Sequence, residues 1–184
     1  LIILNLCFLL LFFFDQTVSD FQFIYKNNWL NSININIIFG LDGLGLMLVL
    51  LTAFLIPTCI LLCWNLSLKN QIKNYCFAFF LLESILLGVF SSLDIMIFYL
   101  LFEAVLIPMF LIIGFYGSRE RRIRSAYLLF LYTLLSSLVM FLSILFIFFK
   151  FGTTDYLILK TLNFDPFSEK LCWFAFFLSF NFIV

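Results

Sequence analysis

One glutamate, Glu103, lies in the middle of an apolar stretch long enough to cross a membrane. The stretch runs from Ser92 to Tyr132 and is interrupted by a dense basic cluster of Arg119, Arg121, Arg122 and Arg124. A carboxylate at mid-membrane depth is costly, so such residues are rare and mark candidate functional sites. Pro108 cannot donate a hydrogen bond to the Ala104 carbonyl, which leaves a polar group beside Glu103 that can hold water. The stretch indicates a chain that moves ions.

The composition excludes a water-soluble domain. The chain is 65% hydrophobic and 11% charged, whereas a soluble domain carries about 25% charged residues. Its mean hydropathy is +1.21 and its formal net charge is zero, which argues against a nucleic-acid surface. Five cysteines without a single histidine are expected to be small apolar residues in lipid rather than metal ligands or disulfides.

Apolar runs predict an all-α, polytopic integral membrane protein with about six transmembrane helices in a single membrane domain, 1–184. The expected helices are 1–14, 42–64, 75–90, 94–116, 123–149 and 171–184. The first run has the length of a signal-peptide core, but it lacks a charged start and a cleavage site, which favours a membrane helix.

Local signals refine these helices. Pro57 and Pro108 are expected to kink the second and fourth helices, and Asp42 and Asp94 to cap their first turns. Gly117 is expected to end the fourth helix. The polar segment 15–41 is predicted to form a short hairpin at the membrane interface, and 151–170 a loop.

Charge distribution predicts the topology. Two crossings separate Lys69 and Lys73 from the arginine cluster, so both groups are expected on one side, with segments 15–41 and 151–170 on the other. The positive-inside rule places the arginine cluster in the matrix or cytoplasm, as a topology anchor. The alternative is that the arginines form a ligand site.

Two carboxylates are expected inside helices, Glu83 and Glu103. They lie 11 and 9 residues from Asp94, about 16 and 14 Å at 1.5 Å per residue, and hence at similar depth. Carboxyls at one depth on neighbouring helices suit a proton relay. Each can instead be a permanently protonated packing partner, and Ser136 and Ser137 are expected either to form a packing notch or to line a wet path.

Three segments together point to a family: LDGLGLMLVLLTAFLIPTCILLCWN, LLFEAVLIPMFLIIGFYGSRERRIRSAYLLFLYTLLSSLVMFLSIL and GTTD. They closely resemble the mitochondrial NADH dehydrogenase subunit 4 family, the antiporter-like membrane subunits of respiratory complex I. The resemblance runs from about Asp20 to Phe180 and includes loops as well as helices.

The resemblance implies a proton-pumping membrane-arm subunit in the mitochondrial inner membrane, with the arginine cluster on the matrix side. The family's functional glutamate falls on Glu103 and a glutamate of the preceding helix on Glu83. The family pairs the first with a lysine of a later, broken helix. NADH, FMN, iron–sulfur clusters and ubiquinone are expected to bind to other subunits, and no cofactor to this chain.

The chain also departs from the family pattern, because the family lysine would fall near Ile183, where there is none. Helices further along the family chain are missing. A second polypeptide is expected to supply them, as from a split gene, unless the sequence is a fragment. The alternatives are a structural scaffold of the membrane arm without its own proton path, or a piece of a cation/proton antiporter.

Overall fold

The computed structural model describes residues 2–15, 17–18, 20–30, 35–63, 72–117 and 121–183. The long helices in these ranges are α1 (Ile2–Phe13), α2 (Gly43–Cys63), α3 (Ile72–Ser91), α4 (Ile95–Tyr116), α5 (Arg122–Phe151) and α7 (Pro166–Ile183). Helices α2 to α5 are each long and apolar enough to cross a membrane. The expectation of a mainly helical, multi-pass membrane protein is confirmed.

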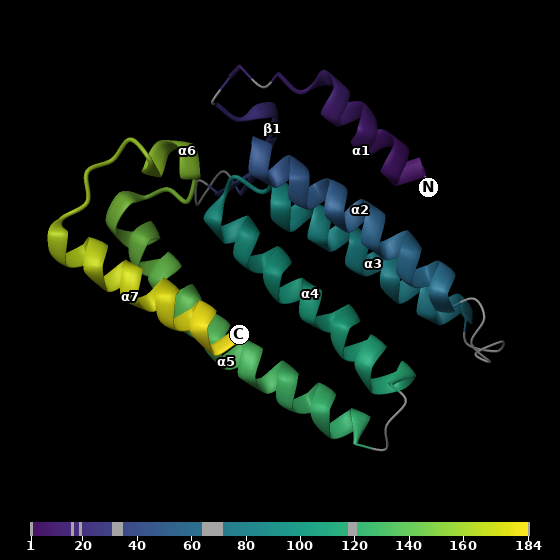
Figure 1. Cartoon of the computed structure of the whole chain (residues 1–184). Coiled ribbons are helices and arrows are strands. Elements are labelled where there is room, and N and C mark those ends of the chain that lie inside the picture. The colour runs from purple at the N-terminus through teal and green to yellow at the C-terminus, as the bar shows by residue number, and fades with distance from the viewer. Residues whose placement is uncertain are drawn as a thin grey trace.

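Helices α2, α3, α4 and α5 lie side by side and alternate in direction (Figure 1). Helix α1 packs against α2, and α7 runs back along the part of α5 nearest to α6, so that the C-terminus lies partway along α5 (Figure 1). Helix α1 has 12 residues and α7 has Glu169 and Lys170 near its start. Among the described residues, length and composition identify four of the six predicted crossing helices as membrane spans.

The predicted helix ends agree with the structure within a few residues, with two exceptions after α5. The segment predicted as a loop contains a short helix, α6 (Tyr156–Leu159), and α7 begins at Pro166 rather than at 171. Asp155 caps α6 through the Leu157 amide, and proline is well suited to a first helical turn. Trp64, Leu1 and Val184, predicted as helix ends, lie outside the described residues.

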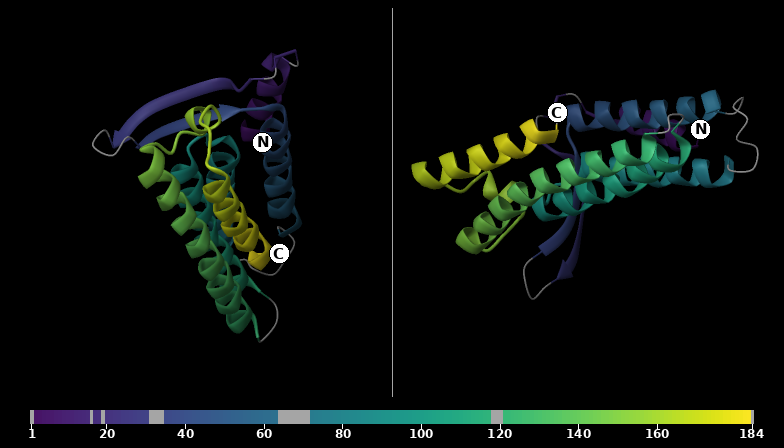
Figure 2. Two further views of the ribbon diagram at one scale, coloured as in Figure 1. Left: turned by 90° about the vertical axis from the view of Figure 1, so that its left-hand side faces the viewer. Right: turned by 90° about the horizontal axis from the view of Figure 1, so that it is seen from below.

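The polar segment before α2 forms the predicted hairpin. Strands β1 (Gln22–Leu30) and β2 (Ile35–Leu41) pair antiparallel and extend across one end of the bundle (Figure 2). The β2 strand faces the helices: Ile38 is buried, and its carbonyl accepts a hydrogen bond from the Leu93 amide at 2.8 Å. The hairpin is thereby attached to the turn between α3 and α4, at what is called here the hairpin end of the bundle.

Close approach of α3 and α4 depends on Gly88. A Cβ atom at this position would lie 3.1 Å from Leu101 Cδ1 of α4, closer than ordinary van der Waals contact. The absent side chain lets α3 and α4 pack closely where Gly88 meets Leu101.

Candidate functional site

The two mid-helix carboxyls are placed symmetrically about the turn between α3 and α4. Glu83 lies eight residues before Ser91, the last residue of α3, and Glu103 eight residues after Ile95, the first residue of α4. At 1.5 Å per residue, both lie about 12 Å from their helix ends. The equal depth expected from the sequence therefore agrees with the observed helix bounds.

Glu83 is almost fully buried in the interior of the bundle. Its exposed fraction is 1%, and neither carboxyl oxygen has a hydrogen-bond partner among the described residues. An ionised carboxylate in such surroundings is strongly disfavoured unless a cation or a hydrogen-bond donor approaches it. The position suits a group that is neutral at rest and ionises only when its surroundings change.

Glu103 is half-buried on α4 and has a polar neighbour on its own helix. Its Oε1 atom is buried and, among the described residues, lacks a hydrogen-bond partner. Tyr99, one helical turn earlier on α4, lies on the same helix face as Glu103. The Tyr99 ring stacks on Phe141 of α5 with ring centroids 5.0 Å apart. Glu103 thus faces the α4–α5 contact.

The two prolines lie inside their helices as predicted. Pro57 is in α2, Pro108 is in α4, and both helices continue past them. Pro108 is buried and has no amide hydrogen, so the Ala104 carbonyl lacks its backbone hydrogen-bond partner. This carbonyl belongs to the residue that follows Glu103 in the helix. The predicted kinks and the water beside Ala104 stay predictions.

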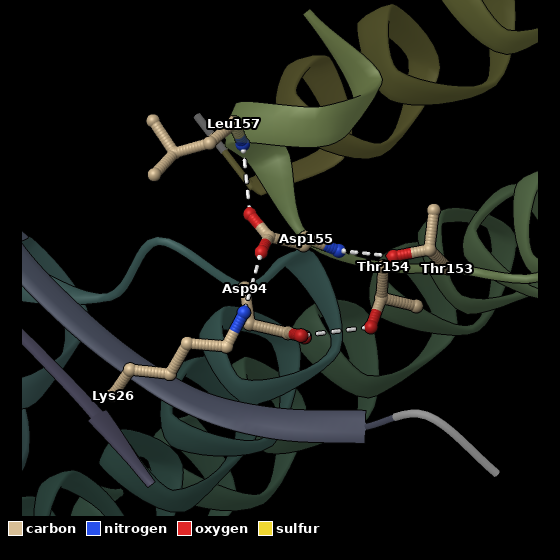
Figure 3. A network of polar contacts seen from close by, with 6 residues as sticks. All are labelled: Lys26, Asp94, Thr153, Thr154, Asp155 and Leu157. Atoms are coloured by element: carbon tan, nitrogen blue, oxygen red, sulfur yellow. Dashed lines mark hydrogen bonds and ion pairs between the residues drawn. The ribbon is translucent and has the colours of Figure 1, made fainter. Parts of the chain in front are cut away.

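A second polar group, absent from the sequence-based site, joins three segments at the hairpin end (Figure 3). Asp94 caps α4: its Oδ1 accepts from the amides of Met96 and Ile97 at 2.9 and 3.3 Å. Its Oδ2 accepts a hydrogen bond of 2.8 Å from the Thr154 hydroxyl, beyond the end of α5. Asp94 is the cap predicted, but it is 1% exposed and also connects two helix ends.

Asp155 extends this network to the hairpin (Figure 3). Its Oδ1 accepts from the Leu157 amide at 2.9 Å, and its Oδ2 lies 3.5 Å from Lys26 Nζ of β1. Because the hairpin and the segment after α5 meet here, segments 15–41 and 151–170 lie at one end of the bundle, as their charges predicted. The network fixes the start of α4, the helix that carries Glu103.

Burial affects the electrostatics of Asp94. It is the main cause that raises the pKa of Asp94 above its ordinary value, and the neighbouring charge of Asp155 adds to the rise. The hydrogen bonds from Thr154 and from the α4 amides oppose the rise, because they stabilise the ionised carboxylate.

Comparison with known proteins identifies the family. The profile of the transmembrane NADH:quinone oxidoreductase/Mrp antiporter family matches residues 92–184, half of the chain. The chain belongs to this family. The matched residues include Glu103, Asp94 and Thr154, whereas Glu83 and Lys26 precede them.

Several curated relatives agree with this assignment. The chain is 52% identical over 168 residues to NADH-ubiquinone oxidoreductase chain 4 of Marchantia polymorpha and 49% identical over 167 residues to that of Arabidopsis thaliana. Both alignments cover 91% of this chain and 34% of the relative. The chain therefore spans about a third of the length of the curated relatives it matches.

Solved structures show the same fold. A chain of respiratory complex I from Thermus thermophilus with bound NADH superposes with a TM-score of 0.79 at 26% identity, over 96% of this chain and 37% of that chain. A chain of an archaeal membrane-bound sulfane sulfur reductase superposes with a TM-score of 0.70 at 18% identity, over 96% and 28%. The second similarity concerns the fold alone.

In this antiporter-family chain, the start of α5, with Arg121, Arg122 and Arg124 of the arginine cluster, lies at the end of the bundle opposite the hairpin (Figure 1). The Arg122 guanidinium donates to the Gly117 carbonyl at 2.7 Å and thereby satisfies the C-terminus of α4, which Gly117 ends as predicted. Arg121 and Arg124 are exposed, and Arg119 lies outside the described residues. Arg122 has a structural role besides its predicted role as an anchor.

Sequence reasoning missed Tyr99 and the Thr154–Asp155 pair as site residues. Tyr99 had a local signal, because it precedes Glu103 by four residues on a predicted helix. The pair is part of the GTTD motif, which contributes to the resemblance without indicating what the residues contact. Only the return of the chain after α5 brings Thr154 to Asp94.

Proposed function

We propose that this chain is a proton-translocating part of the membrane arm of a respiratory NADH:ubiquinone oxidoreductase, with Glu103 as the carboxyl that takes up and releases protons. The observation that carries this proposal is the place of Glu103 inside the matched residues, deep in α4, with a buried and unpaired oxygen. A carboxyl in such surroundings changes its protonation when a charge approaches or withdraws. Glu83, at the same depth on α3, links or modulates this site.

A cation from another segment is part of the proposal. Within the described ranges, the basic residues of α2 to α5 lie in a first or last helical turn, far from Glu103. A positive charge at mid-depth must therefore come from elsewhere, and we assign it to a second polypeptide that carries the remaining helices. Other membrane-arm subunits are the further partners.

The proposed location is the mitochondrial inner membrane, with the arginine cluster on the matrix side. The exposed arginines of the cluster support this orientation, because positively charged residues concentrate on the inner side of a membrane. The acidic residues Asp94, Asp155 and Asp165 lie at the opposite end, the hairpin end. NADH, FMN, iron–sulfur clusters and ubiquinone are assigned to other subunits, which perform the redox chemistry.

The test is Glu103→Gln in the assembled complex, reconstituted in sealed vesicles. Glutamine keeps the size and polarity of the side chain but cannot release a proton. We expect a lower ratio of protons pumped to electrons transferred and a lower coupled turnover, with assembly unchanged on a native gel. Glu169→Gln, an exposed carboxylate in the first turn of α7, is the matched control and keeps both quantities.

Normal pumping by a fully assembled Glu103→Gln complex would overturn the proposed role. If Glu83→Gln were equally silent, the chain would be a scaffold of the membrane arm. Mass spectrometry of the native band tests the partners: a second chain with the remaining helices is expected beside NADH dehydrogenase subunits. Migration without NADH dehydrogenase activity would contradict the assignment.

A further inference from the structure

We infer that the start of α2 binds one phospholipid with a primary-amine head group, a phosphatidylethanolamine, whose two acyl chains occupy two cavities on either side of Asp42. Both cavities lie at the hairpin end, where the membrane span of α2 begins. This site goes beyond the proposed function and does not depend on proton exchange by Glu103.

The first cavity, of about 420 Å³, lies among α2, the turn between α3 and α4, α6 and α7. Leu44, Gly45 and Leu48 form its α2 wall. Phe21 and Tyr156 also line it, and their rings meet edge to face with centroids 5.9 Å apart. A mostly apolar space at the end of a membrane span suits a hydrocarbon chain.

The second cavity, of about 410 Å³, lies between the end of α1, the segment that follows it and the first turns of α2. Gly43, Leu46 and Met47 form its α2 wall. Both cavities fall within the range of roughly 300–1,000 Å³ that small-molecule sites span. Each is therefore large enough to hold part of a lipid chain.

The two cavities lie on opposite faces of α2. An α-helix turns by about 100° per residue, so Leu48 lies about 40° from Leu44 around the helix axis, on the side of the first cavity. Leu46, which lines the second cavity, lies about 200° from Leu44. Asp42 lines both cavities, at the start of the helix. This arrangement matches a lipid whose two chains join at one head group.

The charges around the cavities favour a cationic group. Asp42 and Asp94 line the first cavity, Asp20 and Asp42 line the second, and no basic residue is among the described residues that line them. Both carboxyl oxygens of Asp94 accept hydrogen bonds within the protein. Asp42 uses Oδ1 for the Gly45 amide at 2.7 Å, whereas no hydrogen bond within the described ranges engages its Oδ2. Asp42 Oδ2 can therefore accept from a head-group ammonium.

This chemistry distinguishes among phospholipids. A head group with negative charge alone would be repelled by the acidic residues. A primary ammonium donates N–H hydrogen bonds to a carboxylate, whereas the quaternary ammonium of choline has no hydrogen to donate. The lipid phosphate lies beside the N-terminus of α2, whose first amides have no acceptor within the helix. Phosphatidylethanolamine should therefore bind about tenfold better than phosphatidylcholine, the effect of one hydrogen bond between charged groups.

Photolabelling of the intact complex in phosphatidylcholine nanodiscs tests the site. The probe is phosphatidylethanolamine with a diazirine in each acyl chain, and phosphatidylcholine with the same chains is the comparison. Illumination expels N₂ from each diazirine, and the resulting carbene inserts into a nearby bond of the protein. Peptide mass spectrometry should find adducts on both walls of α2, with about tenfold more from the ethanolamine lipid.

Asp42→Asn tests the head group, because asparagine still caps a helix but carries no charge. The preference for the ethanolamine lipid should fall from about tenfold toward equal labelling. Glu169→Gln is the matched control: it removes an exposed carboxylate of α7 that lines neither cavity, and the preference should stay.

Leu44→Trp and Met47→Trp test the two cavities. Both residues are exposed, one beside each cavity, so tryptophan should fill the space without disturbing the bundle. Since both chains belong to one lipid, each variant should lower labelling in both cavities. Leu51→Trp is the control, because Leu51 is also exposed on α2 but lines neither cavity.

Equal labelling by the two lipids in the native complex would overturn the inference, and so would an unchanged preference in Asp42→Asn. Loss of labelling from the first cavity alone in Leu44→Trp would refute a single two-chain lipid. Absence of adducts from either lipid would also overturn the site, because it would show that protein side chains fill the cavities. These outcomes are distinct from failure of the proposed function, which Glu103→Gln tests by pumping.

Discussion

The Thr154 hydroxyl donates a 2.8 Å hydrogen bond to Asp94 Oδ2, which is otherwise enclosed at the start of α4. Sixty residues separate the two in sequence. The backbone reinforces the contact, because the Ile95 amide donates to the Thr154 carbonyl and the Tyr156 amide to the Leu93 carbonyl. The helix that carries Glu103 is thereby fixed at its first turn to the segment after α5.

Thr154→Val should loosen the first turn of α4. The change leaves a buried carboxylate oxygen without its donor, at a cost of about 1–3 kcal/mol. Hydrogen exchange of peptides from the first turn of α4 in the intact complex should become faster. Thr161→Val is the control, since that exposed hydroxyl only donates to the Ile158 carbonyl. Unchanged exchange in Thr154→Val would show that the contact adds no stability.

The stability of the fold should depend on pH through Asp94. Its folded-state pKa is raised, so its contribution to stability is complete below the unfolded-state pKa of about 3.9 and is lost as the pH rises through the folded-state value. Asn does not titrate. The thermal midpoint of Asp94→Asn relative to the native chain should therefore rise with pH across this window.

Asp15 gives a control of opposite sign. The hydrogen bonds from Thr17 lower the pKa of Asp15, so its contribution is present above the unfolded-state pKa and is lost as the pH falls through the folded-state value. Above that pH window, Asp15→Asn should therefore have a lower thermal midpoint than the native chain. This difference should disappear as the pH falls through the window. If the thermal midpoints of both variants, relative to the native chain, changed with pH in the same direction, the causes assigned to the two pKa shifts would be contradicted.

Gly88→Leu should separate α3 from α4. Its side chain would enter the space of Leu101, and overpacking of this kind costs about 1–3 kcal/mol. The thermal midpoint of the complex should fall, and Leu101→Ala should restore part of it in the double variant. Gly43→Ala, where a Cβ would meet nothing within 4 Å, should not lower the midpoint. Additive effects of the two changes would refute direct contact.

The Lys26–Asp155 ion pair should contribute little by itself. The Lys26 side chain is 49% exposed, and its Nζ is 3.5 Å from the carboxylate, so Lys26→Met should cost at most about 1 kcal/mol and less at high salt. Asp155→Ala should cost more, because the Leu157 amide also loses its cap. Hydrogen exchange of the hairpin and of α6 measures the loss of stability in each variant. An equal loss in Lys26→Met and Asp155→Ala would contradict this ranking.

Gly152 ends α5 in a left-handed conformation, with φ at +71°. Gly152→Ala should cost about 1–2 kcal/mol, since a Cβ is strained at positive φ. Gly152→Asn should cost less. The readout is hydrogen exchange at the C-terminus of α5, and equal protection in both variants would exclude backbone strain as the cause.

Much of the fold was predictable because its determinants are local. Runs of apolar residues define helices α2 to α5, and the caps at Asp42 and Asp94 follow from the side chain that precedes each first turn. Helix α6 and the early start of α7 were not predicted, because the segment that contains them is polar and lacks a long apolar run. The residues that cap these helices act over only a few positions.

The sequence by itself determined the helical membrane fold, the depth of Glu83 and Glu103, and the family, because hydrophobic length and the spacing of a residue from a helix end are properties of one segment. The tertiary structure decided which groups meet: Thr154 with Asp94, Lys26 with Asp155, and Tyr99 with Phe141. These contacts join residues from different elements. They depend on how helices pack and where the chain returns, which no local pattern specifies.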